Sequence, residues 1–174
     1  MGKEIEKKFL INTLPSNLEQ YEQKEIEQGY LCISPIVRIR KSNEDYILTY
    51  KSKFGIASDA EHALDAKVNN EVELPLTKEG YEHLKEKKDG YLIRKTRYII
   101  PLEDGLKAEL DIFKEQLEGL VFAEVEFPDE ETAEQFEPPE WLGENVSSDK
   151  RYSNYYLSTV KNFRLLQEEL ETKK

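Results

Sequence analysis

The chain has 174 residues, of which 25 are Lys or Arg and 36 are Asp or Glu, so its formal net charge is −11. Such an acidic chain lacks the basic surface that non-specific binding to nucleic acid or to an anionic membrane requires. Its 10 Tyr and 7 Phe predict a folded core, and its length suits one domain spanning residues 1–174.

Short segments in which apolar and charged residues alternate recur along the chain. Alternation at period two is typical of β-strands with one buried face. It occupies residues 4–11, 36–41, 45–53, 70–75, 92–101, 106–113 and 121–127, with a weaker segment at 26–34. Turn-forming residues separate most of these segments, so the sequence predicts eight short strands in an antiparallel sheet or barrel.

Three helices are predicted between and after the strands. Thr77 is a suitable N-cap for a helix over residues 78–87, and a short acidic helix opens at Pro128 and runs to about residue 136. The last helix is expected over residues 152–172. Its apolar residues stand three or four apart and should dock on the barrel: Tyr156, Val160, Phe163, Leu166 and Leu170. Residues 54–67 form a long connection of low regularity.

The sequence also bears on the compartment of the protein. Cys32 is the only cysteine, which excludes a disulfide framework and fits a reducing compartment. No segment approaches the ~20 apolar residues that span a bilayer, and the N-terminus alternates in charge where a signal peptide would be apolar. We therefore expect a cytoplasmic protein with no membrane partner.

Within the predicted strands, like charges stand two residues apart and so share one face of the strand. Glu4 and Glu6 do so in the first strand. The same pairing recurs in Arg38 with Arg40, Lys51 with Lys53, Glu71 with Glu73, Lys95 with Arg97, Glu109 with Asp111, and Glu124 with Glu126. One such pair is usually a solvated face, but repulsion repeated in seven strands calls for a partner of opposite charge.

The two kinds of pair are suited to different ligands. Paired carboxylates suit a divalent cation, and paired Lys and Arg suit a polyanion such as phosphate. Oxygen ligands without His or Cys favour Mg²⁺ or Mn²⁺ over Zn²⁺. A closed barrel of eight strands is wide enough inside for one small ligand, so the charged face would line a tunnel. The predicted fold class is α+β and mainly β: an eight-stranded antiparallel closed barrel with a charged interior, flanking helices and a C-terminal helix.

The order of these motifs resembles that of the CYTH superfamily, the triphosphate tunnel metalloenzymes. Residues 4–8, Glu-Ile-Glu-Lys-Lys, match the family's Glu-x-Glu-x-Lys signature, and matches follow in the family's order at 37–40, 48–51, 71–73, 95–98, 109–111, 120–127 and 149–154. The likeness covers residues 3–160 and is most similar to small bacterial single-domain members that resemble inorganic triphosphatases. The chain departs from the pattern at Asn69 and Asn70, where many relatives carry a basic residue.

The resemblance implies a role for each charged residue. Glu4, Glu6 and Glu126 would bind Mg²⁺ or Mn²⁺, and Glu4, Glu6, Glu124 and Lys8 would be catalytic. The implied phosphate-binding residues are Lys8, Arg38, Arg40, Lys51, Lys53, Lys95, Arg97 and Arg151, the last at one mouth of the tunnel. Glu71, Glu73, Glu109 and Asp111 would bind a second metal, or orient the cations as salt-bridge partners.

The implied activity is divalent-metal-dependent hydrolysis of inorganic triphosphate, or of a related triphosphate or short polyphosphate. Adenylate cyclases and thiamine triphosphatases of the same superfamily use the same triphosphate grip, so both stay alternatives. A non-catalytic polyphosphate-binding module is an alternative of another class, although the presence of Glu4, Glu6 and Glu126 favours an enzyme. Members of the superfamily are often dimers, so the resemblance is also compatible with a homodimer.

Overall fold

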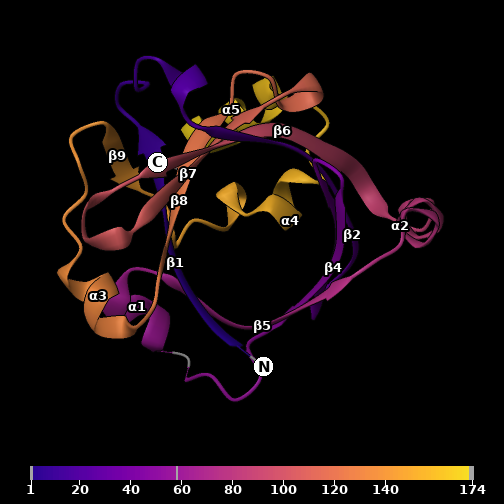
Figure 1. Ribbon diagram of the computed structural model, residues 1–174, viewed down its shortest axis with the longest axis horizontal. Helices are drawn as coiled ribbons and strands as arrows, with labels where there is room; N and C mark the ends of the chain where they lie inside the picture. Colours follow the sequence, from indigo (N-terminus) through magenta and orange to yellow (C-terminus); the bar gives the residue numbers. More distant parts are fainter. Residues whose placement is uncertain (1, 58, 173–174) are drawn as a thin grey trace.

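The computed structural model of the protein describes residues 2–57 and 59–172. Within them, nine strands form one sheet (Figure 1). The strands are β1 (Gly2–Ile11), β2 (Glu22–Ile33), β3 (Ile36–Ser42), β4 (Asp45–Ser52), β5 (Lys67–Pro75), β6 (Asp89–Pro101), β7 (Lys107–Phe113), β8 (Val121–Phe127) and β9 (Leu142–Asn145). The helices are α1 (Ala60–Leu64), α2 (Lys78–Lys85), α3 (Glu130–Gln135), α4 (Asn154–Leu157) and α5 (Phe163–Thr172).

The sheet closes on itself. Its strand order is β5-β4-β3-β2-β6-β7-β8-β1-β9, and a further pairing joins β5 to β1. The first eight strands thus form a ring in which each pairs with both neighbours, and these pairings are antiparallel. Figure 1 looks into this ring, with α2 outside the wall on one side and α1 and α3 on the other. The predicted eight-stranded antiparallel closed barrel is confirmed.

One edge of β1 is shared by two strands. Its first half pairs with β5, from Gly2 opposite Glu71 to Glu6 opposite Lys67. Its second half pairs with β9, which places Phe9 opposite Asn145. The sequence did not predict β9, because a four-residue strand that contains a glycine is too short to show alternation.

Several strands begin earlier than the alternation predicted. Residues 22–25, Glu-Gln-Lys-Glu, are wholly polar yet belong to β2, because the opposite strand β6 pairs with them up to Ile99. Asp89-Gly90, a dipeptide typical of turns, instead opens β6. Gly90 has a φ of 67°, and a Cβ there would lie 2.5 Å from the carbonyl oxygen of Ser158, so this crossing of the two chain segments requires glycine.

The two helices predicted before the C-terminus are confirmed. Thr77 caps α2, since its hydroxyl oxygen accepts a hydrogen bond from the Gly80 amide at 3.0 Å. Asp129 caps α3 in the same way, accepting from the Thr132 amide at 2.7 Å. The connection over residues 54–67 contains the short helix α1, which its low regularity did not predict.

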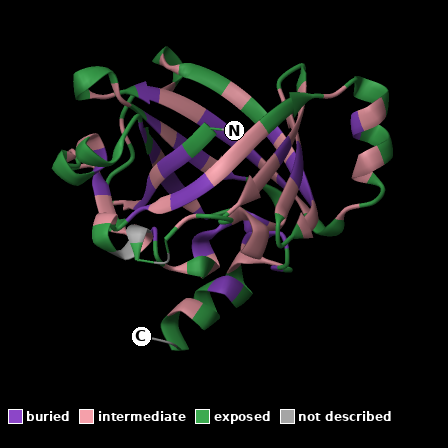
Figure 2. Cartoon of the chain, turned by 90° about the horizontal axis from the view of Figure 1, so that it is seen from below, coloured by how far each residue is buried: buried purple, intermediate pink, exposed green. Residues whose placement is uncertain are grey.

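The single C-terminal helix over residues 152–172 was wrong. The segment forms a 3₁₀ turn at Lys150–Tyr152, then α4, and then α5. The helix breaks after α4 because the carbonyl of Ser158 accepts the Tyr91 amide of β6 at 2.7 Å. Helix α5 then restarts with the Asn162 side chain accepting from the Leu165 amide. In Figure 1, α4 lies within the outline of the barrel, and Figure 2 shows α5 projecting from one end.

Apolar side chains form two clusters. The first lies on the outer face of the wall near α1, α3 and β9, and includes Ile5, Val68, Val125 and Ala133. The second includes Phe113 and Phe122, which share the parity of Asp111 and Glu124 and therefore face inward, and it contains Leu157 of α4. One end of the barrel is thus filled by apolar side chains and the C-terminal segment. None of the described helices is long and apolar enough to cross a bilayer.

Candidate active site

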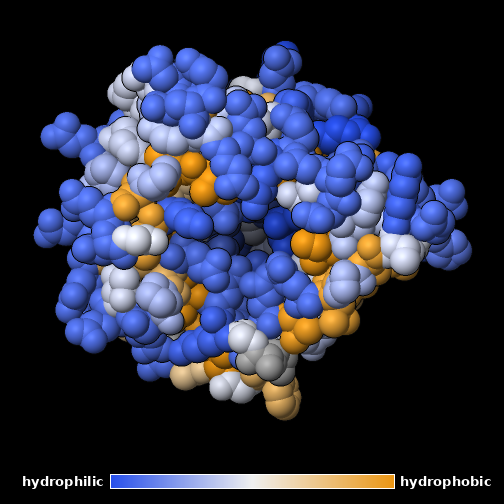
Figure 3. All heavy atoms as spheres, viewed as in Figure 1, coloured by the Kyte–Doolittle hydropathy of each residue, from blue (hydrophilic) through white to orange (hydrophobic). Residues whose placement is uncertain are grey.

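The barrel encloses a cavity of about 800 Å³. Figure 3 shows its opening surrounded mainly by hydrophilic residues. Its lining contains acidic and basic side chains in equal number, and most of the predicted site residues are among them: Glu4, Glu6, Lys8, Arg38, Arg40, Lys51, Lys53, Glu71, Glu73, Arg97, Glu109, Glu124 and Glu126. The charged strand face therefore does point into the barrel.

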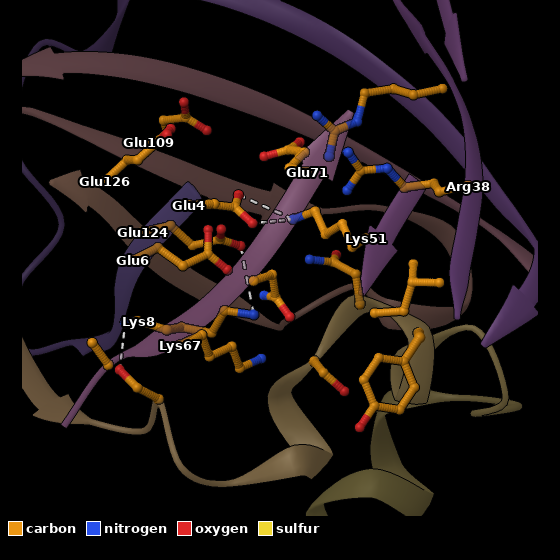
Figure 4. Close-up of a pocket in the computed structure, with 18 of the residues that line it drawn as sticks. Glu4, Glu6, Lys8, Arg38, Lys51, Lys67, Glu71, Glu109, Glu124 and Glu126 are labelled. Atoms are coloured by element: carbon orange, nitrogen blue, oxygen red, sulfur yellow. Dashed lines mark hydrogen bonds and ion pairs between the residues drawn. The ribbon is translucent and has the colours of Figure 1, made fainter. Parts of the chain in front are cut away.

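The register of β1 against β8 brings the first carboxylates together. Glu6 lies opposite Glu126, and Lys8 lies opposite Glu124. Residues directly opposite each other in an antiparallel pair project to the same face. Glu4, Glu6 and Glu124 consequently approach one another inside the cavity, with Glu126 nearer solvent (Figure 4).

The crowding of these carboxylates alters their proton affinity. Burial, together with the charges of Glu124 and Glu4, raises the pKa of Glu6 to about 8. Burial and the charges of Glu4 and Glu6 raise the pKa of Glu126 to about 7. Burial would also raise the pKa of Glu124, but the positive charges of Lys8, Arg97 and Lys95 outweigh it and hold that pKa well below its usual range. The cluster as a whole is short of positive charge.

The donor set of this cluster fits a hard divalent cation. Among the described residues that line the cavity, the titratable ligands are carboxylates, with no His or Cys. Oε1 of Glu124 is buried and accepts no hydrogen bond, and its nearest cation, Lys8 Nζ, is 3.5 Å away. No three carboxylates of the described chain are already arranged around one point. The ammonium of Lys51 lies 2.9 Å from Oε2 of Glu4, in the place beside Glu4 that a metal ion would compete for.

The predicted phosphate-binding residues that line the cavity fall into two groups. Lys8, Lys51, Lys53 and Arg97 each form an ion pair with a carboxylate. Arg38 and Arg40 form none within the described chain, since they donate to the neutral side chains of Thr49 and Gln28 respectively. Burial and the adjacent charge of Arg38 lower the pKa of Arg40 to about 10. This pair therefore offers positive charge that an anionic ligand would compensate.

Three predicted site residues do not line the cavity. Lys95 and Asp111 have no exposed surface. Asp111 accepts hydrogen bonds from Lys95 Nζ at 2.7 Å and from Arg97 Nε and Nη2 at 2.7 and 2.8 Å. Of its two predicted roles, the geometry thus favours the salt-bridge partner. Arg151 is paired with Asp149 and donates to the carbonyl oxygen of Glu169, away from the cavity.

The structure also adds lining residues that sequence reasoning missed. They include Lys24, Asn69, Ser147, Asn154 and Lys67. Lys67 shares the parity of Glu71 and Glu73, so extending the predicted strand by three residues would have found it. Asn154 belongs to the C-terminal segment, whose insertion into the barrel no local pattern signals.

Known proteins share both the sequence and the fold. No family model matches the chain. The chain is 36% identical over 158 residues to an inorganic triphosphatase of Nitrosomonas europaea, covering 89% of this chain and 96% of that protein. It is 35% identical over 170 residues to an inorganic triphosphatase of Acetivibrio thermocellus, covering 94% and 99%.

Solved structures agree with these relatives. The crystal structure of an inorganic triphosphatase matches with a TM-score of 0.64 and 34% identity, covering 93% of this chain and 98% of that one. A protein from Pyrococcus horikoshii OT3, 22% identical, shares the fold with a TM-score of 0.54, covering 76% and 84%.

Fold and cavity together define a β-barrel with a charged internal site. The two curated relatives identify its family, since each is more than 30% identical to the chain over nearly its whole length. The chain belongs to the inorganic triphosphatase family, and the resemblance found in its sequence motifs is confirmed.

Proposed function

We propose that this chain hydrolyses inorganic triphosphate in the barrel cavity with the help of Mg²⁺ or Mn²⁺. One observation carries the proposal: a cluster of crowded carboxylates shares the barrel cavity with arginines that have no carboxylate partner in the described part of the chain. A polyanion together with a divalent cation would neutralise both parts of this wall at once. The inorganic triphosphatase relatives support the same substrate.

The proposed roles follow the position of each side chain. Glu4, Glu6 and Glu126 hold the metal, and Glu124 lies beside them. Arg38 and Arg40 bind phosphate oxygens, for which the planar guanidinium is suited. Lys8, Lys51, Lys53 and Arg97 also line the cavity and add positive charge along the substrate. Lys95 and Asp111 lie inside the barrel but outside the cavity lining, where Asp111 accepts hydrogen bonds from both Lys95 and Arg97 and so orients Arg97.

Positioning and charge neutralisation provide most of the catalysis in phosphoryl transfer. A bound divalent cation would supply Lewis acidity toward phosphate oxygens and an attacking water. The arginines and Lys8 fix the phosphate chain and offset the charge of the departing group. One carboxylate of the group Glu4, Glu6 and Glu124 accepts the proton of the attacking water. The filled end of the barrel limits the access of bulk water to this site.

A product assay on the wild-type protein tests the proposal. Tripolyphosphate, ATP and thiamine triphosphate are each supplied with Mg²⁺ and with Mn²⁺, and phosphate, pyrophosphate and cyclic AMP are measured. We expect fastest phosphate release from tripolyphosphate. Cyclic AMP would indicate a cyclase, faster cleavage of thiamine triphosphate would change the substrate, and tight binding without turnover would indicate a non-catalytic module. Each of these three results contradicts the proposal.

The affinity for the divalent cation is expected to rise with pH up to about 8. Because burial, Glu124 and Glu4 raise the pKa of Glu6 to about 8, a metal must displace a proton from the site at neutral pH. Affinity should fall by about tenfold for each pH unit below that pKa. Calorimetric titration in buffers of different ionisation enthalpy measures both the affinity and the protons released. An affinity that is constant between about pH 6 and about pH 8 would contradict the assignment of Glu6 as a ligand.

A further inference from the structure

Lys67 lines the cavity but does not belong to any of the like-charged pairs identified in the sequence. It is the first residue of β5 and stands opposite Glu6 in the pairing of β5 with β1. Lys67, Asn69, Glu71 and Glu73 all line the cavity, as alternate residues of one strand do. In Figure 4 the side chains of Lys67 and Lys8 extend into the cavity in the same direction, below Glu6 and Glu124.

Among the residues that the structure describes, the ammonium group of Lys67 has no hydrogen-bond or ion-pair partner. It takes part in no hydrogen bond and in no ion pair within 4 Å among the described residues, although the side chain is half-buried. Lys8, by contrast, donates to the carbonyl oxygen of Tyr152 at 2.7 Å, and Lys51 donates to Glu4 at 3.0 Å. An ammonium that is partly withdrawn from water and lacks an acceptor costs free energy, which an anionic ligand would recover.

Its position places Lys67 at the inner part of the cavity. Ser147 and Asn154 of the C-terminal segment line the same cavity, and the Lys8 side chain is fastened to that segment through Tyr152. Arg38 and Arg40, which also have no carboxylate partner among the described residues, come from β3. Figure 4 shows Arg38 on the other side of the cavity from Lys67. Lys67 therefore supplies positive charge on the side of the carboxylates, opposite the arginines.

We infer that Lys67 binds a phosphate oxygen of the substrate, beside Lys8 at the inner part of the cavity. The inference rests on the proposed function for its substrate. A phosphate chain lying between Arg38 and Arg40 on one side and Lys67 and Lys8 on the other has cations along both flanks. Lys67 then also sets the inner limit to which the terminal phosphate group reaches.

A competing role for Lys67 is purely structural, as a cation that offsets the charge of Glu6 and Glu124. The two roles predict different changes when the charge is removed. A lost phosphate contact weakens tripolyphosphate binding and leaves metal affinity unchanged or tighter. A lost structural cation changes metal affinity and stability and leaves tripolyphosphate affinity as it was.

The test compares Lys67→Met and Lys67→Arg with the wild type, and uses Lys78→Met on the exposed face of α2 as the matched control. Binding of tripolyphosphate is measured by calorimetry in EDTA, and KM and kcat are measured with Mg²⁺ or Mn²⁺. We expect Lys67→Met to weaken binding and raise KM by about tenfold or more, because a hydrogen bond to a charged group is lost. Lys67→Arg should recover most of the affinity, and Lys78→Met should match the wild type.

Different failures remain distinguishable. Unchanged affinity and KM in Lys67→Met, with an active wild type, overturn the role of Lys67 and leave the proposed function intact. If the wild type binds tripolyphosphate without cleaving it and Lys67→Met binds it more weakly, the phosphate-binding role of Lys67 is supported and the proposed hydrolytic function is overturned. A wild type that does not bind tripolyphosphate overturns both. If Lys67→Met does not fold, Lys67→Gln replaces it in the same binding and KM measurements, and its melting temperature shows whether it is folded.

Discussion

Replacing Glu6 by Gln is expected to abolish the release of phosphate from tripolyphosphate that depends on Mg²⁺ or Mn²⁺, a loss of at least about 1000-fold in kcat. Glu6 lies near both Glu4 and Glu124, whose charges raise its pKa, so its carboxylate is central to the proposed metal site. The amide keeps the shape of the side chain and removes the charge that would hold the cation. Phosphate release is measured across a range of metal concentrations, with Glu103→Gln on the exposed surface as the control.

The same variant should not lose stability. The pKa of Glu6 in the folded protein, about 8, is above its value in an unfolded chain. The folded state therefore binds this proton more tightly, and the wild type without metal loses stability as pH rises from about 4.5 to about 8. Glu6→Gln cannot ionise there, so at pH 8 its melting temperature should equal or exceed that of the metal-free wild type. Unchanged turnover in a folded Glu6→Gln would refute the metal assignment.

Replacing Asp111 by Asn should reduce the free energy of unfolding by about 3–5 kcal/mol. Asp111 is fully buried and is the carboxylate to which both Lys95 and Arg97 donate. The uncharged amide leaves the buried Lys95 without its carboxylate partner and leaves Arg97 only its partly exposed pair with Glu109. Urea denaturation measures the loss of stability, and KM for tripolyphosphate should rise as well, because Arg97 loses the contact that orients it.

Glu109→Gln is the matched control for this prediction. Glu109 also pairs with Arg97, but its side chain is 36% exposed. Ion pairs that water reaches are worth at most about 1 kcal/mol, so the control should lose little stability. Equal losses of unfolding free energy in the two variants would show that burial does not determine how much Asp111 contributes to stability.

The sequence predicted the barrel because its inward face carries like charges at period two. Glu4 with Glu6 and Arg38 with Arg40 mark that face without any knowledge of the partner strands. The alternation did not predict strand segments that are stabilised only by hydrogen bonds to a neighbouring strand. The polar start of β2 and the four residues of β9 are held by β6 and β1 respectively. The break between α4 and α5 depends likewise on a contact with Tyr91, far away in the sequence.

The sequence predicted which side chains of the candidate site point into the barrel. It did not predict how far along the barrel axis each of them lies. Lys95 and Arg97 have the same parity and charge, yet Arg97 lines the cavity and Lys95 is sealed behind it with Phe113 over its ammonium. Period two reports which way a side chain points and carries no information on how far along the barrel it lies. The depth depends on the stagger of neighbouring strands and on the inserted C-terminal segment.

The inserted C-terminal segment has a consequence for substrate entry and product release. Because apolar side chains and α4 fill one end of the barrel, we expect a charged substrate to enter and leave through the hydrophilic opening of the cavity that Figure 3 shows. Reactant and products would have to pass through the same opening in turn. A linear phosphate chain would enter by its tip and leave in pieces, with the outermost piece departing first. The middle of a long chain could not thread through, so only its ends would be accessible.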